Sequence, residues 1–112
     1  MNVAALQPEV QQALPFAAAA LRHAPEAPGC YVLCAWEHTV LYIGRAGNLR
    51  RRLAQHLKGR GGQVHPSLGY ALTFHWRPFA PDALAQLERG WMNHALLVDG
   101  ALPPWNRVYA GR

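Results

Sequence analysis

The chain has 112 residues, of which 51% are hydrophobic and 10% are aromatic, and its formal net charge is +5 at pH 7. This length suits one domain with a single modest core and is too short for two. The apolar content excludes a disordered tail, because disordered chains carry too few apolar side chains to bury a core.

The positive charge is concentrated in one stretch of the chain. No acidic residue occurs between residues 38 and 81, and the basic residues of that stretch are Arg45, Arg50, Arg51, Arg52, Lys58, Arg60 and Arg77. Such a field fits a polyanionic partner, nucleic acid above all. A solvated basic face is the alternative interpretation, and charge alone does not separate the two.

The cysteines and the apolar runs exclude several classes of protein. Cys30 and Cys34 lie in a predicted strand, roughly 13 Å apart at about 3.3 Å per residue, beyond the ~7 Å limit for a disulfide. We expect reduced core thiols, which suit a cytoplasmic protein, nucleoid-associated in a bacterium. The apolar run over residues 13–21 is short and broken by Pro15. It predicts neither a membrane span nor a signal peptide, so no membrane partner is expected.

The first elements in chain order are a helix and a hairpin. Residues 1–27, rich in Ala and Gln, predict a helical extension bent at Pro15 that covers one side of a sheet, with a docking role as the alternative. Pro28-Gly29 breaks the chain, and residues 28–112 form the remaining domain. Residues 30–36 predict a strand covered on both faces, and residues 40–44 predict its hairpin partner.

Two helices and one strand complete the predicted fold. Gly47-Asn48 caps a helix over residues 49–57, which the glycines after residue 58 end. Alternating apolar residues predict a strand over 70–76, followed by a helix over about 82–98 and an extended tail at 103–106. The order predicts a small α/β (α+β) domain with a three-stranded, mainly antiparallel sheet flanked by helices.

Helical periodicity separates scaffold from candidate chemistry. In the helix over 49–57, leucines at every fourth position form the buried stripe. Arg52 and His56 lie one turn apart on one margin of that stripe, whereas Arg50 lies on the opposite margin. In the last helix, Glu88 falls among inward apolar residues and needs a partner there. A structural salt bridge to Arg52 or Arg45 and a metal ligand are both open interpretations.

An ordered set of motifs runs through these elements. The strings Gly29-Cys30-Tyr31 and Tyr42-Ile43-Gly44 are followed by the basic string at 45–53, by the carboxylate at 88 and by an asparagine at 106. This set resembles the GIY-YIG nucleases, metal-dependent DNA-cutting domains, with Cys30 in place of the usual isoleucine. The resemblance covers roughly residues 28–107. It is closest to the N-terminal nuclease domain of the bacterial excision-repair incision subunit (UvrC-type).

The resemblance implies a catalytic set. Its members are Tyr31, Tyr42, Arg52, His56, Glu88 and Asn106. Glu88 would hold a single Mg²⁺ or Mn²⁺ ion, Arg52 would clamp the phosphate, and Asn106 would help to fix the site. The general base would be Tyr42, its pKa lowered by nearby cations, with Tyr31 orienting the attacking water and His56 as the alternative base.

The basic string supplies the expected nucleic-acid contacts, which are Arg45, Arg50, Lys58 and Arg60. Arg45 stands where some members of the family carry a lysine, but a guanidinium is a poor base and is expected to bind phosphate. His65 is left open between a catalytic histidine and a loop residue.

The expected function is a divalent-metal-dependent endonuclease that hydrolyses DNA phosphodiester bonds, structure-selective in repair or recombination. One alternative is a non-catalytic nucleic-acid-binding module with the same fold. Another is a domain that recruits a partner through residues 1–27. RNA stays an alternative substrate, and a partner protein or dimerisation would serve substrate targeting.

Overall fold

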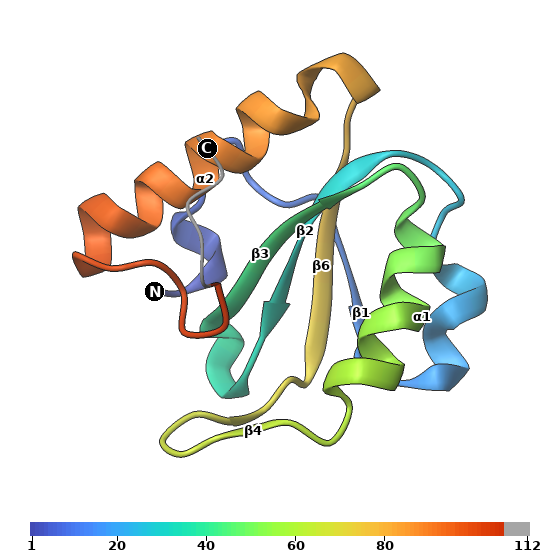
Figure 1. Ribbon diagram of the computed structural model, residues 1–112, viewed down its shortest axis with the longest axis horizontal. Coiled ribbons are helices and arrows are strands. Elements are labelled where there is room, and N and C mark those ends of the chain that lie inside the picture. The colour runs from blue at the N-terminus through green and yellow to red at the C-terminus, as the bar shows by residue number, and fades with distance from the viewer. Residues whose placement is uncertain (107–112) are drawn as a thin grey trace.

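The structure is a computed structural model, and it describes residues 1–106. Its main sheet has four antiparallel strands in the order β1-β6-β2-β3. The strands are β1 (Gln12–Pro15), β2 (Gly29–Cys34), β3 (Val40–Ala46) and β6 (Thr73–Pro78). Two helices, α1 (Leu49–Arg60) and α2 (Leu84–Asp99), lie on opposite faces of this sheet (Figure 1). The predicted α/β fold with an antiparallel sheet is confirmed.

Short elements join the main ones. A small separate ribbon consists of β4 (Val64–His65) and β5 (Gly69–Tyr70), and it follows α1. Four 3₁₀ helices complete the described chain, namely η1 (Val3–Ala5), η2 (Ala18–His23), η3 (Trp36–His38) and η4 (Pro81–Ala83). Among residues 1–106, no helix is both long and apolar enough to cross a membrane.

The sheet separates two apolar clusters. On the α1 side, Tyr31 and Phe74 pack against Leu49 and Leu53. The cluster on the α2 side contains Cys30, Val32, Ile43, Leu87 and Trp91. Both cysteines are buried and free, as predicted. Since successive strand residues point to opposite faces, the two faces of the β2–β3 hairpin carry different chemistry.

The helix predicted for residues 1–27 is wrong. This segment contains η1 and η2, and between them β1 pairs with the edge of β6. Ala and Gln favour helix, but Pro8 and Pro15 each remove a backbone donor, and the unpaired edge of β6 offers partners that outweigh local propensity. The segment therefore supplies the fourth strand of the sheet and is not a helical extension beside it.

Several element bounds also differ from the prediction; α1, for example, continues to Arg60. The strand expected from residue 70 begins only at Thr73, because Gly69–Tyr70 pairs with β4 instead. Val98 continues the apolar spacing of the last helix, from which we expect it to face inward, but it is 54% exposed near the end of α2. In these last two cases the regular apolar pattern continues past the point at which the tertiary partner ends.

The two tyrosine-containing strings of the β2–β3 hairpin interlock. The hairpin register sets Tyr31 directly opposite Gly44. A Cβ atom at Gly44 would lie 2.5 Å from the Tyr31 Oη and 2.6 Å from its Cζ. The phenol therefore occupies the space that a side chain on residue 44 would need, and Tyr31 is fully buried there.

Replacing Gly44 by alanine should destabilise the fold. The new methyl group would overlap the Tyr31 ring, and overpacking of this kind costs about 1–3 kcal/mol of unfolding free energy. Gly47→Ala is the matched control, because a Cβ there meets no atom within 4 Å. Urea denaturation of the two variants should separate them clearly. Equal stability for both would contradict the packing described here.

Candidate active site

A buried tyrosine–histidine pair joins the sheet to α1. The Tyr31 hydroxyl and the His56 Nε2 are hydrogen-bonded, and the two ring centroids are 5.3 Å apart. Burial, followed by the negative charge that Tyr42 would carry, raises the pKa of Tyr31, so this phenol keeps its proton. The expectation that Tyr31 orients the attacking water does not fit, because its side chain has no exposed surface.

His56 is neutral at physiological pH. Burial, then the charges of Arg60 and Arg52, lower the pKa of His56 to about 4. The ring of the half-buried Tyr42 meets the His56 ring edge-on, with centroids 5.2 Å apart. His56 and Tyr42, the two expected base candidates, are thus in contact, whereas Tyr31 lies beneath them and holds the imidazole.

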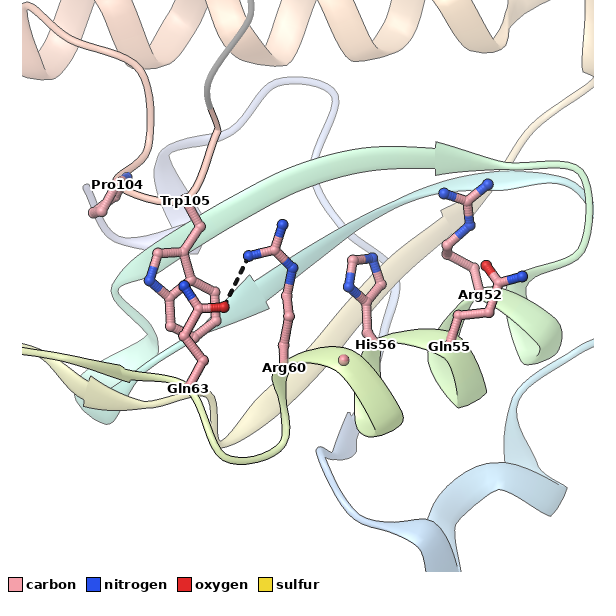
Figure 2. A pocket seen from close by; sticks show the side chains of 8 residues that line it. Arg52, Gln55, His56, Arg60, Gln63, Pro104 and Trp105 are labelled. Carbon is pink, nitrogen blue, oxygen red and sulfur yellow. Dashed lines mark hydrogen bonds between the residues drawn. The ribbon is translucent and has the colours of Figure 1, made fainter.

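A cationic cleft opens beside this pair. Its volume is about 530 Å³, and its lining residues are Arg52, Gln55, His56, Gly59, Arg60, Gln63, Pro104 and Trp105. Figure 2 shows the side chains of Arg52, Gln55, His56 and Arg60 projecting from α1. Trp105 lies at the Arg60 end of the cleft. No carboxylate lines the cleft within residues 1–106. A polyanion would therefore meet two guanidinium groups without acidic competition.

Glu88 lies on the other side of β3. It projects from α2, its side chain is 12% exposed, and its Oε1 lies 3.6 Å from the Arg45 Nε. The salt-bridge interpretation is realised with Arg45 and not with Arg52. Burial raises the pKa of Glu88, while the charges of Arg45 and then Arg52 oppose that rise. The influence of Arg52 places Glu88 within electrostatic range of the cleft.

Glu88 is the one carboxylate at this site in the described residues that could be a ligand of a hard divalent cation. The Glu88 carboxylate is largely desolvated, and a cation would offset that cost. No group of three His, Cys, Asp or Glu side chains able to hold a metal occurs in the described part of the chain. An ion bound here would keep most of its waters, as Mg²⁺ does.

Asn106 binds the edge of β3. Its Oδ1 accepts from the Ile43 amide and its Nδ2 donates to the Ile43 carbonyl, each over 2.8 Å. The Trp105 amide also donates to the Leu41 carbonyl over 2.9 Å. These bonds hold the tail in the position of a short additional strand beside Tyr42. They place the Trp105 ring on the cleft wall.

The four predicted nucleic-acid contacts divide. Arg60 lines the cleft, and Arg45 is exposed beside Glu88. Lys58 is exposed but does not line the cleft.

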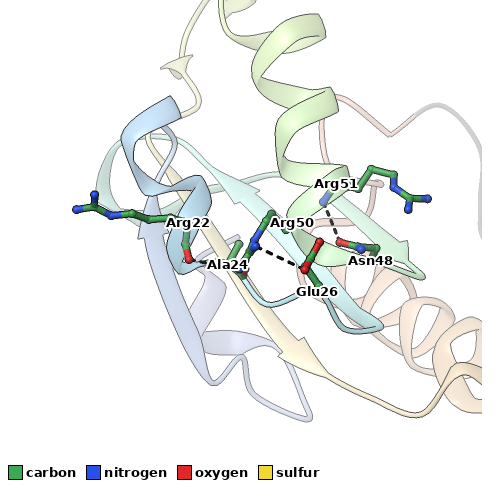
Figure 3. Close-up of polar contacts among 6 residues, drawn as sticks. All are labelled: Arg22, Ala24, Glu26, Asn48, Arg50 and Arg51. Atoms are coloured by element: carbon green, nitrogen blue, oxygen red, sulfur yellow. Dashed lines mark hydrogen bonds and ion pairs between the residues drawn. The ribbon is translucent and has the colours of Figure 1, made fainter.

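The fourth predicted contact, Arg50, lies elsewhere. Its Nε donates to the Ala24 carbonyl over 2.8 Å, and its guanidinium is 3.7 Å from Glu26, whereas Arg51 points away (Figure 3). The prediction for Arg50 is not supported, because its side chain holds the segment after η2.

Some contributors were not predicted from the sequence, and one open residue has a structural role. Gln55, Gln63, Pro104 and Trp105 line the cleft, but no chemical pattern marks the two glutamines. A tryptophan next to the tail asparagine was the one signal that could have been used. The His65 Nδ1 accepts the amides of Ser67 and Leu68, so this ring stabilises the turn of the β4–β5 ribbon.

Comparison with known proteins places this site in a family. The model of the GIY-YIG catalytic domain matches residues 27–96. The chain belongs to the GIY-YIG family. The prediction of a GIY-YIG-type endonuclease is thereby confirmed, and the matched range contains both tyrosine strings, Arg52, His56 and Glu88.

Similar proteins are bacterial. This GIY-YIG domain is 43% identical over 83 residues to the UvrABC system protein C of Nitrobacter winogradskyi, a match that covers 74% of the chain. It is 33% identical over 73 residues to the UvrABC system protein C of Streptomyces avermitilis, covering 61% of the chain. The matched segment amounts to 11% of each of these proteins. The resemblance to the UvrC-type nuclease domain is confirmed.

Replacing Asn106 by aspartate should loosen the tail. The new carboxylate cannot donate to the Ile43 carbonyl and would repel it, so we expect a loss of about 1–3 kcal/mol. Asn106→Ala should cost less than Asn106→Asp, because it leaves no repulsive group. Trp105 fluorescence during denaturation reports the docking of the tail. An aspartate variant as stable as wild type would refute the paired geometry.

Stability should fall as the pH is lowered from about 6.5 towards 4. Burial lowers the pKa of His75 to about 4, as it does for His56, so below pH 6.5 the unfolded chain binds protons that the folded chain does not. Each histidine should cost about 3 kcal/mol over this range. Glu88 acts in the opposite sense, so a single-residue comparison is needed.

His75→Gln isolates one of these contributions. His75 lies outside the cleft, and glutamine can still bond Thr73, the partner of its Nε2. The unfolding free energy of wild type minus that of the variant should fall steadily from pH 7 to pH 4.5. A difference that is constant across this range would mean that His75 does not titrate as described.

Proposed function

We propose that this domain is a divalent-metal-dependent endonuclease that hydrolyses DNA phosphodiester bonds and prefers particular DNA structures during repair or recombination. The observation that carries the proposal is the arrangement of side chains about β3. Arg52, the neutral His56 and Tyr42 lie on one side of this strand, and the desolvated Glu88 lies on the other. Membership of the GIY-YIG family supports the chemistry. The similarity to UvrABC system protein C supports a role in DNA repair, and a cytoplasmic location belongs to the same proposal.

Arg52 would bind the scissile phosphate. Its guanidinium lines the cleft and could donate two parallel hydrogen bonds to the phosphate oxygens. Charge builds up on those oxygens in the transition state, so a donor that is already positioned lowers the barrier. Removing it should cost on the order of 3 kcal/mol, a hundredfold or more in rate.

Tyr42 and His56 would handle the proton of the attacking water. Tyr42 is half-buried, and its ring contacts His56 and the Arg60 guanidinium, two groups that line the cleft. The hydrogen bond between the Tyr31 hydroxyl and the His56 Nε2 fixes the imidazole in one orientation, and burial keeps it neutral. We assign Tyr42 as the base, His56 as the alternative base, and Tyr31 as a positioning residue.

Glu88 would hold the single Mg²⁺ or Mn²⁺ ion, and Asn106 would keep the β3 edge in register beside it. A bound ion of this type supplies Lewis-acid stabilisation of the phosphate and a water of lowered pKa. Arg45 lies next to Glu88, where it can contact a neighbouring phosphate once the carboxylate has a metal partner.

The contact between Arg45 and Glu88 also favours a second candidate function. If this ion pair persisted, the carboxylate would be unavailable to a metal, and the domain would be a non-catalytic nucleic-acid-binding module. Arg45 is 48% exposed, which weakens the pair, because solvent screens it. We therefore rank the endonuclease first. RNA as substrate, and a partner protein or dimerisation for targeting, belong to the same proposal.

Cleavage assays test both functions in one experiment. Wild type, Arg52→Ala and Glu88→Gln are incubated with labelled flap, nicked, single-stranded and duplex DNA in Mg²⁺ or Mn²⁺. Arg51→Ala is the matched control, because it removes the same charge from the exposed side of α1. We expect both site variants to lose at least about a hundredfold in rate, and the control to keep most of its activity.

The pattern of results separates the candidates. A wild-type protein that binds DNA in a salt-dependent manner and cuts none of the four substrates would be a binding module. Cleavage that survives in Arg52→Ala and Glu88→Gln would remove both residues from the site. A preference for flap or nicked DNA would support structure selectivity, and equal rates on all substrates would contradict it.

A further inference from the structure

We propose that Arg60 binds a second phosphate group of the substrate strand, separate from the scissile phosphate at Arg52. The proposal rests on the endonuclease function proposed above and gives the cleft a direction. The substrate strand would run along α1 from Arg52 towards Arg60, past His56.

Arg60 is held in position before any ligand arrives. Its guanidinium carbon lies 4.6 Å from the centroid of the Tyr42 ring and 5.4 Å from that of Trp105. Both distances are within the range of about 6 Å for cation–π attraction. Its Nη1 also donates to the Gln63 Oε1 over 3.1 Å (Figure 2). A guanidinium already fixed in this way loses little conformational freedom when it binds a ligand.

The fixed guanidinium keeps capacity for an anion. Arginine has five N–H donors in one plane, and Gln63 accepts from one of them while the Tyr42 and Trp105 rings lie within cation–π distance. The remaining donors can form the paired hydrogen bonds that phosphate oxygens accept. No carboxylate lines the cleft in the described residues. A phosphate is therefore the ligand that this cation fits best.

Arg60 and Arg52 stand at different places along α1, and the His56 ring lies between their guanidinium groups in Figure 2. Eight residues of α-helix separate the two arginines, which is two turns and about 12 Å along the axis. In a B-form duplex each strand carries one phosphate per about 3.4 Å of axis. The two arginines therefore meet different phosphates of one strand, within about four nucleotides of each other in a duplex and fewer in an extended strand.

The test is a methylphosphonate walk. A set of otherwise identical oligonucleotides carries one neutral methylphosphonate at successive positions on either side of the cut. We expect wild-type kcat/KM to fall roughly ten- to hundredfold at one position beyond the scissile phosphate, as for a lost hydrogen bond to a charged group. Arg60→Ala should be insensitive at that position alone, because the contact is already missing.

Two further variants keep the test decisive. Arg51→Ala removes the same charge from the exposed side of α1, outside the cleft, and should retain the wild-type pattern. Arg60→Gln keeps a planar polar group against the rings and should repeat the Arg60→Ala pattern even if alanine disturbs the fold.

Each outcome bears on one proposal. If Arg60→Ala and Arg60→Gln show the same sensitive positions as wild type, Arg60 only supports Tyr42 and Trp105, and the second phosphate site is wrong. If wild type cuts nothing, the endonuclease proposal fails. Filter binding with the same oligonucleotides then tests the phosphate site by itself, with the same position-specific loss expected for wild type and its absence in Arg60→Ala.

Discussion

The Tyr31 phenol, packed on Gly44 and hydrogen-bonded to His56, is the interaction on which the site depends. The Tyr31 side chain starts on β2, passes through the space beside Gly44 of β3, and ends at the middle of α1. Because α1 is rigid, one fixed residue in its centre also fixes the residues one turn away on each side. Arg52 and Arg60 thus take their places in the cleft from a contact in which neither participates.

The same contact explains why the two glycine-containing strings act as a unit in this fold. The glycine of the second string makes room for the tyrosine of the first, and the register of the hairpin brings the two residues opposite each other. Burial keeps the phenol protonated, so the pair is a neutral link in a cationic surrounding. A charged link at that place would interact with both arginines and would couple the fold to pH more strongly.

β3 divides the electrostatics of the site. Arg52, His56 and Arg60 lie on the α1 side, and Glu88 reaches the same edge from α2. A substrate phosphate at this edge would meet cations from one helix and a carboxylate suited to a metal from the other. Because β3 lies between these opposite charges, direct pairing of Arg52 with Glu88 is limited.

Local periodicity predicted the hairpin, α1, α2 and the shared margin of Arg52 and His56, because those patterns depend only on helix and strand geometry. Long-range partners could not be predicted in this way. β1 formed because β6 had an open edge, Arg50 bonded carbonyls from η2, and Trp105 reached Arg60 from the tail. Motif spacing placed Tyr31 in the predicted catalytic set. It carried no information about the hydrogen-bond partner of the Tyr31 hydroxyl.

The docking of the tail has a consequence for how the protein acquires its site. Asn106 and Ile43 are 63 residues apart in the chain, and the strand that pairs with β1 is also distant in sequence. Within the main sheet only the β2–β3 pair forms from near neighbours, so folding should be slow for a domain of this size. The cleft gains its last wall, Pro104 and Trp105, only when residues 103–106 meet β3. A nascent or partly folded chain thus presents the basic helix α1 without a finished cleft, and assembly of the fold itself delays any attack on nucleic acid.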